Sequence, residues 1–79
     1  MRIIKYYTSH CIGCKMLTKS LEQVKKKFPD LEIIERDAEK GTDGYAIVSV
    51  PFMVIQVEGK EDVEIVGAVP PSEIERHLK

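Results

Sequence analysis

The sequence predicts an α/β fold, a mixed four-stranded sheet with helices on both faces, in the order β-α-β-(α)-β-β-α. Two observations predict it. Short runs rich in β-branched residues are typical of strands, whereas apolar residues that recur every three to four positions indicate amphipathic helices. The opening strand–helix–strand order implies a parallel pair with a right-handed crossover. Two later strand-like runs around a short turn imply an antiparallel hairpin.

The first half of the chain supplies one strand and the long helix. Residues 2–7, "RIIKYY", are almost continuously apolar or β-branched, as in a strand covered on both faces. Residues 12–28 carry apolar side chains at helical spacing, which predicts an amphipathic helix with Ser9 as its N-cap and Cys11 in its first turn. Pro29 ends this helix because it disfavours helical backbone in the residue before it.

A second strand and a long connector follow. Residues 31–36, "LEIIER", predict the strand that pairs with the first. Residues 37–50 form the connector, in which Gly41 and Gly44 weaken any helix. We therefore expect only one short, poor helix there, around Asp43–Ile47.

The last part of the chain predicts a hairpin and a closing helix. Residues 52–57 and 62–66 are strand-like and flank a turn at Gly59. Residues 70–79 open with prolines, which are tolerated in a first helical turn, and continue with apolar side chains four apart. No repeat or low-complexity tract interrupts the chain, so we expect a single domain over residues 1–79.

Composition excludes several classes of partner. The 79 residues carry a formal net charge of −1, which favours no nucleic acid. No apolar run approaches the roughly 20 residues that span a bilayer, so we expect no membrane association. The N-terminus has no apolar stretch or cleavage site typical of a signal peptide. We therefore expect a cytoplasmic protein, and a monomer.

The two cysteines, Cys11 and Cys14, form a C-x-x-C pair at the start of the long helix. In a cytosolic chain such a pair is typical of catalysis or metal binding. Disulfide exchange needs a thiolate, and the N-terminal end of a helix should lower the pKa of Cys11 below the free value of about 8.5. Cys14 lies one turn deeper, where it can attack a mixed disulfide on Cys11. Gly13 between them leaves room for a substrate sulfur.

A C-x-x-C that opens a helix directly after a first strand resembles the thioredoxin/glutaredoxin superfamily. A second match is "SVPF" at residues 49–52, and a third is the turn with Gly67 before the last helix. The resemblance implies a thioredoxin-like fold in which Pro51 is cis and lies beside the cysteines, while the backbone of Val50 pairs with substrate. It also implies that Gly67 allows close approach of chain or partner.

The departures from the family refine the expected activity. Full-length thioredoxins carry a buried carboxylate on the strand just before the active site, whereas that strand here offers Lys5 and no acid. Near the last strand, "VGAVPP" lacks the acid with which glutaredoxins bind glutathione. The resemblance therefore implies a minimal, glutaredoxin-sized enzyme that reduces protein disulfides like a thioredoxin. Its electron donor would be a flavin-dependent enzyme of the thioredoxin-reductase type. Its roles would be electron transport and cell redox homeostasis, with ribonucleotide reductase as one candidate substrate. No cofactor beyond the Cys11–Cys14 disulfide is expected.

Two other classes of function are consistent with the pair. One is a metal-binding or redox-sensing module on the same fold, and a structural metal site would need four ligands in a tetrahedral arrangement. His10 and His77 are the only histidines, and neither follows a ligand spacing, so such a site would have to bridge two chains. A disulfide isomerase or oxidase would need an exported protein. We expect no metal.

Two side chains beside the pair have open roles. A protonated His10 could lower the pKa of Cys11, or His10 could be a solvated loop residue. Lys15 could shape the surface potential at the site, or belong to the solvated helix face.

Overall fold

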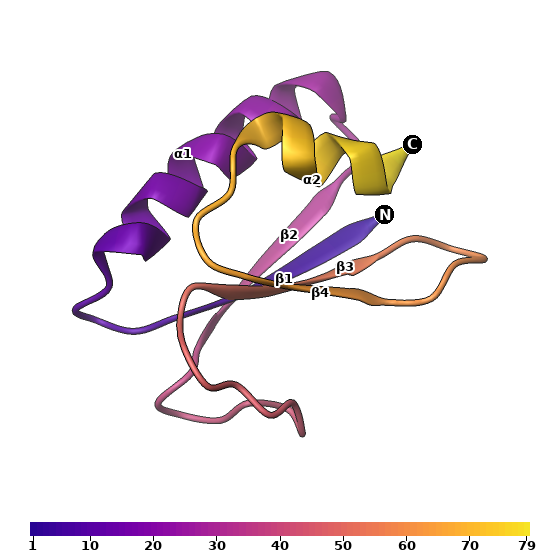
Figure 1. The fold of residues 1–79 in the computed structure, drawn as a ribbon. Coiled ribbons are helices and arrows are strands. Elements are labelled where there is room, and N and C mark those ends of the chain that lie inside the picture. The colour runs from indigo at the N-terminus through magenta and orange to yellow at the C-terminus, as the bar shows by residue number, and fades with distance from the viewer.

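The computed structural model describes residues 1–79 (Figure 1). Its elements in chain order are β1 (Arg2–Tyr7), α1 (Ile12–Lys27), β2 (Glu32–Asp37), β3 (Phe52–Gln56), β4 (Val63–Val66) and α2 (Pro71–Leu78). The strands form one sheet in the order β2-β1-β3-β4. β1 pairs in parallel with β2, and β3 is antiparallel to both β1 and β4. The predicted mixed four-stranded sheet is confirmed.

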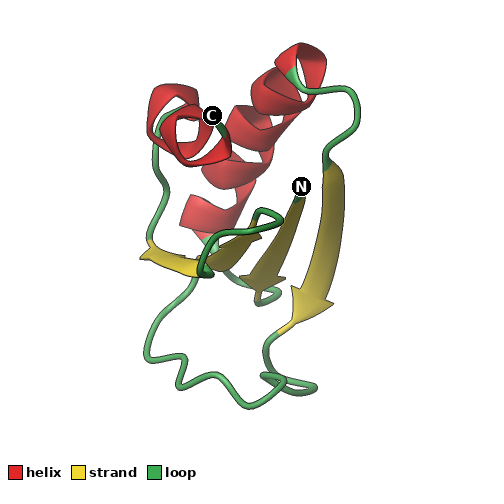
Figure 2. Cartoon of the chain, turned by 90° about the vertical axis from the view of Figure 1, so that its right-hand side faces the viewer, coloured by secondary structure: helices red, strands yellow, loops and turns green.

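Both helices cover the same face of the sheet (Figures 1 and 2). Nine buried apolar side chains from the sheet, the two helices and the loop before β2 make the main core there: Ile3, Leu17, Leu21, Val24, Leu31, Met53, Ile55, Ile74 and Leu78. The prediction of helices on both faces is therefore wrong. The closing helix returns over the face that α1 already covers, because its apolar side chains, Ile74 and Leu78, join the same core.

The opposite face is covered by the connector between β2 and β3, without a helix (Figure 2). The short helix predicted around Asp43–Ile47 is absent, and turns and extended backbone occupy those residues. Asp43 has φ of 51° and Gly44 has φ of 88°, in the left-handed region, which a right-handed helix cannot contain. These two residues instead turn the chain so that Tyr45 and Ile47 pack on the sheet.

An aromatic cluster fixes the connector to its face. The rings of Tyr6, Tyr45 and Phe52 lie 5.8 to 6.1 Å apart between centroids. The Tyr6 hydroxyl donates to Oδ2 of Asp43 at 2.5 Å. Burial, reinforced by this hydrogen bond, raises the pKa of Tyr6 to about 12. Burial raises the pKa of Tyr45 as well. Ring packing and the Tyr6–Asp43 hydrogen bond therefore hold the connector to this face.

The element ends follow the local sequence closely. α1 ends at Lys27 with Phe28 as C-cap, directly before Pro29, as predicted. The hairpin turn between β3 and β4 contains Gly59 with φ of 83°, which a glycine adopts without strain. Neither helix is long and apolar enough to cross a membrane.

Candidate active site

Cys11 caps the N-terminus of α1. Its backbone is extended, with φ of −103°, and its Sγ accepts a hydrogen bond from the backbone N–H of Cys14 at 3.0 Å. The predicted N-cap, Ser9, is therefore wrong. Ser9 and His10 form a turn after β1, so the helix begins only at Ile12 and the sulfur takes the role expected of the serine hydroxyl.

The two cysteines form a disulfide across this first turn, with their Cα atoms 5.2 Å apart. They differ in access. Cys14 is buried, with 5% of its surface exposed, whereas Cys11 is partly exposed at the helix end. No group of three or more His, Cys, Asp or Glu side chains is arranged to hold a metal ion. His77 lies near Glu73 in α2, with Nε2 3.8 Å from a carboxylate oxygen.

The Val50–Pro51 segment lies against the cysteine pair. The peptide bond between the two residues is cis. A Cβ added to Gly13, between the cysteines, would lie 3.0 Å from Cδ of Pro51 and 3.8 Å from Cβ of Ala68. The absence of a side chain at Gly13 therefore lets the proline ring pack directly against the C-x-x-C turn.

Gly67 completes this side of the site. Its N–H donates to the carbonyl oxygen of Pro51 at 2.8 Å, which ties the end of β4 to the cis peptide. Gly67 has φ of 100°, and no atom lies within 4 Å of a Cβ built there. Its backbone conformation therefore accounts for the glycine within this chain, and close contact does not. The structure thus brings the predicted Cys11, Cys14, Pro51 and Gly67 to one end of the molecule.

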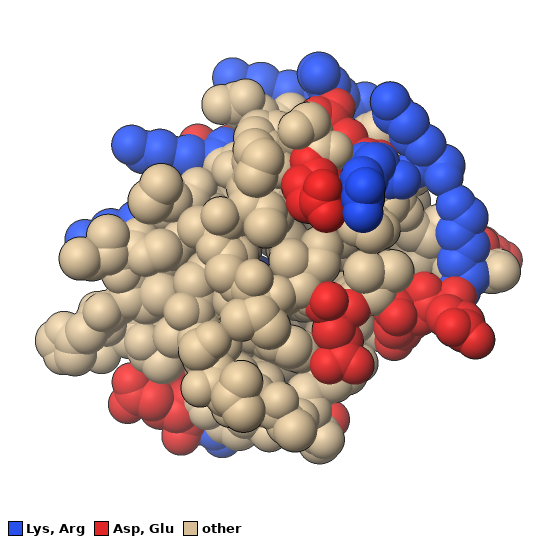
Figure 3. Space-filling model, viewed as in Figure 1, with Lys and Arg blue, Asp and Glu red and all other residues tan.

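Exposed apolar side chains surround this end. Ile12 and Met16 on α1 are 80% and 60% exposed, and Val48 and Val66, near Pro51 and Gly67 in the chain, are also exposed. Figure 3 shows mostly uncharged atoms on the side of the molecule where β1 leads into α1, whereas Lys and Arg gather over the helices. The first turns of α1, which carry the disulfide, therefore expose two large apolar side chains to solvent.

A cleft of about 270 Å³ runs beside the disulfide. It is lined by Lys5, Tyr7, Thr8, Ser9, Cys11, Cys14, Lys15, Thr18 and Glu35. Lys5 is only 3% exposed, and its Nζ donates to Oγ1 of Thr18 and to Oε1 of Glu35, the latter at 3.2 Å. The Thr18 hydroxyl donates to the carbonyl oxygen of Cys14 at 3.0 Å.

Glu35 is the side chain that sequence reasoning missed. The parallel register places it directly beside Lys5. Aligning the predicted strands, 2–7 and 31–36, from their first residues would have placed Ile34 beside Lys5, so the charged pair depends on the register of the folded sheet. His10 and Lys15 are both exposed, and Lys15 lines the cleft. No interaction in the structure decides their roles.

Comparison with known proteins assigns this arrangement to a family. The Thioredoxin family model matches residues 1–79. The thioredoxin of Chlamydia trachomatis is 29% identical over 68 residues, which cover 82% of this chain and 67% of that protein. The SPbeta prophage-derived thioredoxin-like protein YosR of Bacillus subtilis is 28% identical over 79 residues, covering 100% of this chain and 96% of that protein.

A solved structure supports the fold. Chloroplastic thioredoxin z superposes with a TM-score of 0.84 at 23% identity, over 96% of this chain and 73% of that one. Thioredoxins exchange disulfides through a C-x-x-C pair, and Cys11 and Cys14 form that pair here. The chain therefore belongs to the thioredoxin family and is a thiol–disulfide oxidoreductase.

Proposed function

We propose that Cys11 is the attacking thiolate and Cys14 the resolving thiol in the reduction of protein disulfides. The observation that carries this assignment is the difference in access, since Cys11 is partly exposed at the helix N-terminus and Cys14 is buried. Backbone N–H groups and the helix dipole at that end favour a thiolate over a thiol. Cys11 would attack one sulfur of the target disulfide and release the other as a thiolate. Cys14 would then attack Cys11 and release the second.

The target would bind as an extended segment across Val50, Pro51 and Gly67. The backbone N–H and carbonyl of Val50 make no hydrogen bond within the chain, so both are free to pair with a substrate strand. The exposed Ile12 and Met16 offer apolar contact beside it. His10 and Lys15, at the rim, would tune the charge that the target meets.

The electron donor would be a flavin-dependent enzyme of the thioredoxin-reductase type, and glutathione would be a poor substitute. The segment of residues 66–71, "VGAVPP", which borders the site at Gly67, contains no acid to bind the glutathione ammonium group. The protein would thereby serve electron transport and cell redox homeostasis, with ribonucleotide reductase as one candidate target. The disulfide itself would be the only redox group.

We further propose that the protein acts as a monomer in the cytoplasm. A chain whose only cysteines form an exchangeable pair suits a compartment that keeps thiols reduced. Sedimentation of the reduced and oxidised chain would test the first point, and fractionation of the source cells would test the second.

Reduction of insulin tests the proposed function with both donors. The chain is supplied either with NADPH and a thioredoxin reductase or with NADPH, glutathione and glutathione reductase. We expect the first system to support turnover and the second to remain close to the rate without the chain. Equal turnover with both systems would contradict the choice of donor, and no turnover with either would contradict the proposed reduction of proteins.

A further inference from the structure

A buried positive charge lies beside the cysteine pair. Lys5 is 3% exposed and lines the same cleft of about 270 Å³ as both cysteines. We propose that Lys5 is a positioning residue for disulfide exchange, a fixed counter-charge that stabilises the thiolate of Cys14 while it resolves the mixed disulfide. This inference rests on the roles proposed above for Cys11 and Cys14 and deepens them.

The strand pattern aims Lys5 at the helix. Side chains alternate along β1, so Lys5 shares the face of Ile3, which lies in the core beneath α1. There the Lys5 ammonium donates to the Thr18 hydroxyl, which donates in turn to the Cys14 carbonyl oxygen at 3.0 Å. Thr18 stands one turn after Cys14 on α1. This short chain of contacts fixes the ammonium under the turn that carries the resolving sulfur.

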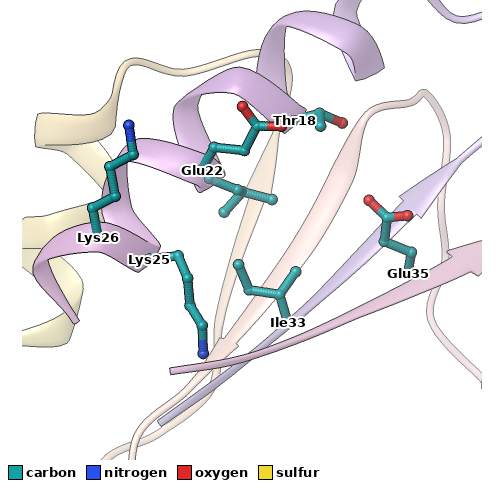
Figure 4. Close-up of a pocket in the computed structure, with 7 residues that line it drawn as sticks. Thr18, Glu22, Lys25, Lys26, Ile33 and Glu35 are labelled. Atoms are coloured by element: carbon teal, nitrogen blue, oxygen red, sulfur yellow. The ribbon is translucent and has the colours of Figure 1, made fainter. Parts of the chain in front are cut away.

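The charge of Lys5 is only partly compensated in the disulfide form. Its one carboxylate partner is Glu35, whose side chain is 54% exposed and therefore shared with solvent. Figure 4, a close-up of a neighbouring pocket that Thr18 and Glu35 also line, shows Glu35 projecting from β2 toward α1, the helix that carries Thr18. A buried charge is costly unless it is paired. A thiolate on Cys14 would supply a second, buried partner. The ammonium therefore favours the state in which the Cys11–Cys14 disulfide is broken and Cys14 is ionised.

Other titratable groups around the cleft do not supply this charge. Lys15 on α1 is exposed at the rim, Tyr7 on β1 carries no positive charge, and Glu35 on β2 is negative. An ammonium at this position cannot accept the proton of Cys14, as a carboxylate could. Lys5 therefore acts as a counter-ion, and the proton passes to solvent through the open cleft.

The resolving step joins the two cysteines and releases the target. The Cys14 thiol loses its proton to solvent, and its thiolate attacks Sγ of Cys11 in the mixed disulfide. The Cys11–Cys14 bond forms, the bond between Cys11 and the target breaks, and the target leaves as a thiolate. The cysteine pair is oxidised and the target is reduced. The reductase of the proposed function returns two electrons to the pair.

The test reads the ionisation of Cys14 alone. In a Cys11→Ser background, absorbance at 240 nm is followed against pH to find the pKa of Cys14. Lys5→Met should raise that pKa by about one unit or more, a tenfold loss of thiolate at a given pH, because an opposite charge nearby favours the charged form. Glu35→Gln should lower it, since a negative charge is removed. Lys5→Arg, which keeps the charge, should restore most of the effect.

Lys15→Met is the matched control, because it removes an equal charge from the exposed rim of the same cleft and should shift the pKa of Cys14 far less. An unchanged titration in Lys5→Met, or shifts in the same direction for Lys5→Met and Glu35→Gln, would overturn the inference. If Lys5→Met does not fold, Glu35→Gln tests the inference alone. A lowered pKa of Cys14 in that variant supports the inference, and a raised or unchanged pKa overturns it.

A kinetic readout separates the inference from the function on which it rests. In the two-cysteine chain, Lys5→Met should slow release of the second target thiolate about tenfold near neutral pH, and the deficit should shrink as the pH rises. If the parent chain reduces insulin but Lys5→Met releases the target at the parent rate, only the inference fails. If the parent chain does not reduce insulin at all, the proposed function fails with it.

Discussion

The two faces of the sheet are built differently. The helix face has a continuous aliphatic core of nine buried side chains, and one charged residue, Lys5, is buried beside it. The connector face has no helix, and its cover is fixed by the rings of Tyr6, Tyr45 and Phe52. The cysteines begin α1, on the helix face, whereas Pro51 ends the connector. The active site therefore lies where the two kinds of packing meet. We expect a different kind of change to destabilise each face.

The largest effect on stability is expected on the helix face. Leu17 is fully buried on α1, and Leu17→Ala should lower the free energy of unfolding by about 2–5 kcal/mol, from lost burial and the cavity left behind. Urea unfolding measures this. Met16→Ala, one residue away and 60% exposed, is the matched control and should change stability by less than about 0.5 kcal/mol. Equal losses in the two variants would contradict the assigned core.

The connector face should weaken at alkaline pH. The pKa of Tyr6 is raised to about 12 in the folded chain, against about 10 unfolded. The stability that neutral Tyr6 contributes is therefore complete below pH 10 and is lost as the pH rises toward 12. A shift of this size corresponds to about 3 kcal/mol at most. Urea unfolding at a series of pH values should show the decline.

Tyr6→Phe sharpens this comparison. At neutral pH it should cost about 1 kcal/mol, because the hydrogen bond to Asp43 is lost while the ring packing stays. Above pH 10 the variant should lose less stability than the parent chain, because its residue 6 cannot ionise. A parallel decline in the two chains would mean that the Tyr6–Asp43 contact does not hold the connector.

The smallest change is expected where the two faces meet. Gly13→Ala would place a Cβ 3.0 Å from Cδ of Pro51, so the proline or the first turn of α1 must shift by a few tenths of an ångström. We expect insulin reduction to slow by a few-fold, with stability nearly unchanged since alanine favours a helix. Gly59→Ala is the control with the opposite expected outcome, a loss of stability without a loss of activity. Its φ of 83° makes alanine costly by about 1 kcal/mol, yet it lies away from the site and should keep full activity.

The same difference between the faces decides what could be predicted from the sequence. Periodicity places α1 within a residue, because its buried side chains face one core, whereas runs of β-branched and apolar residues place the strands. It does not show which face receives α2, since one apolar stripe fits either. Periodicity does not predict the structure of the connector, because Asp43 and Gly44 turn the chain and its packed side chains, such as Tyr45, follow no regular spacing.

The site divides in a similar way. The C-x-x-C pair can be read directly from the sequence, whereas cis Pro51 and the turn at Gly67 follow from the resemblance of the motifs around them to the thioredoxin/glutaredoxin superfamily. The usual preference for a hydroxyl at the N-cap predicts Ser9, whereas the sulfur of Cys11 fills that position. Glu35 has no local signal. Its place beside Lys5 depends on the pairing register of β1 and β2, which exists only once the sheet is formed.

The central claim is that the accessible Cys11 attacks the target disulfide and the buried Cys14 resolves the mixed disulfide. Trapping of that mixed disulfide tests the claim most directly. Reduced Cys14→Ser and Cys11→Ser variants are each mixed with a peptide disulfide, and the covalent adducts are weighed by mass spectrometry. The account predicts a rapid, stable adduct on Cys11 in the Cys14→Ser variant and almost none in the Cys11→Ser variant. Adducts that form equally fast on both cysteines, or faster on Cys14, would contradict it.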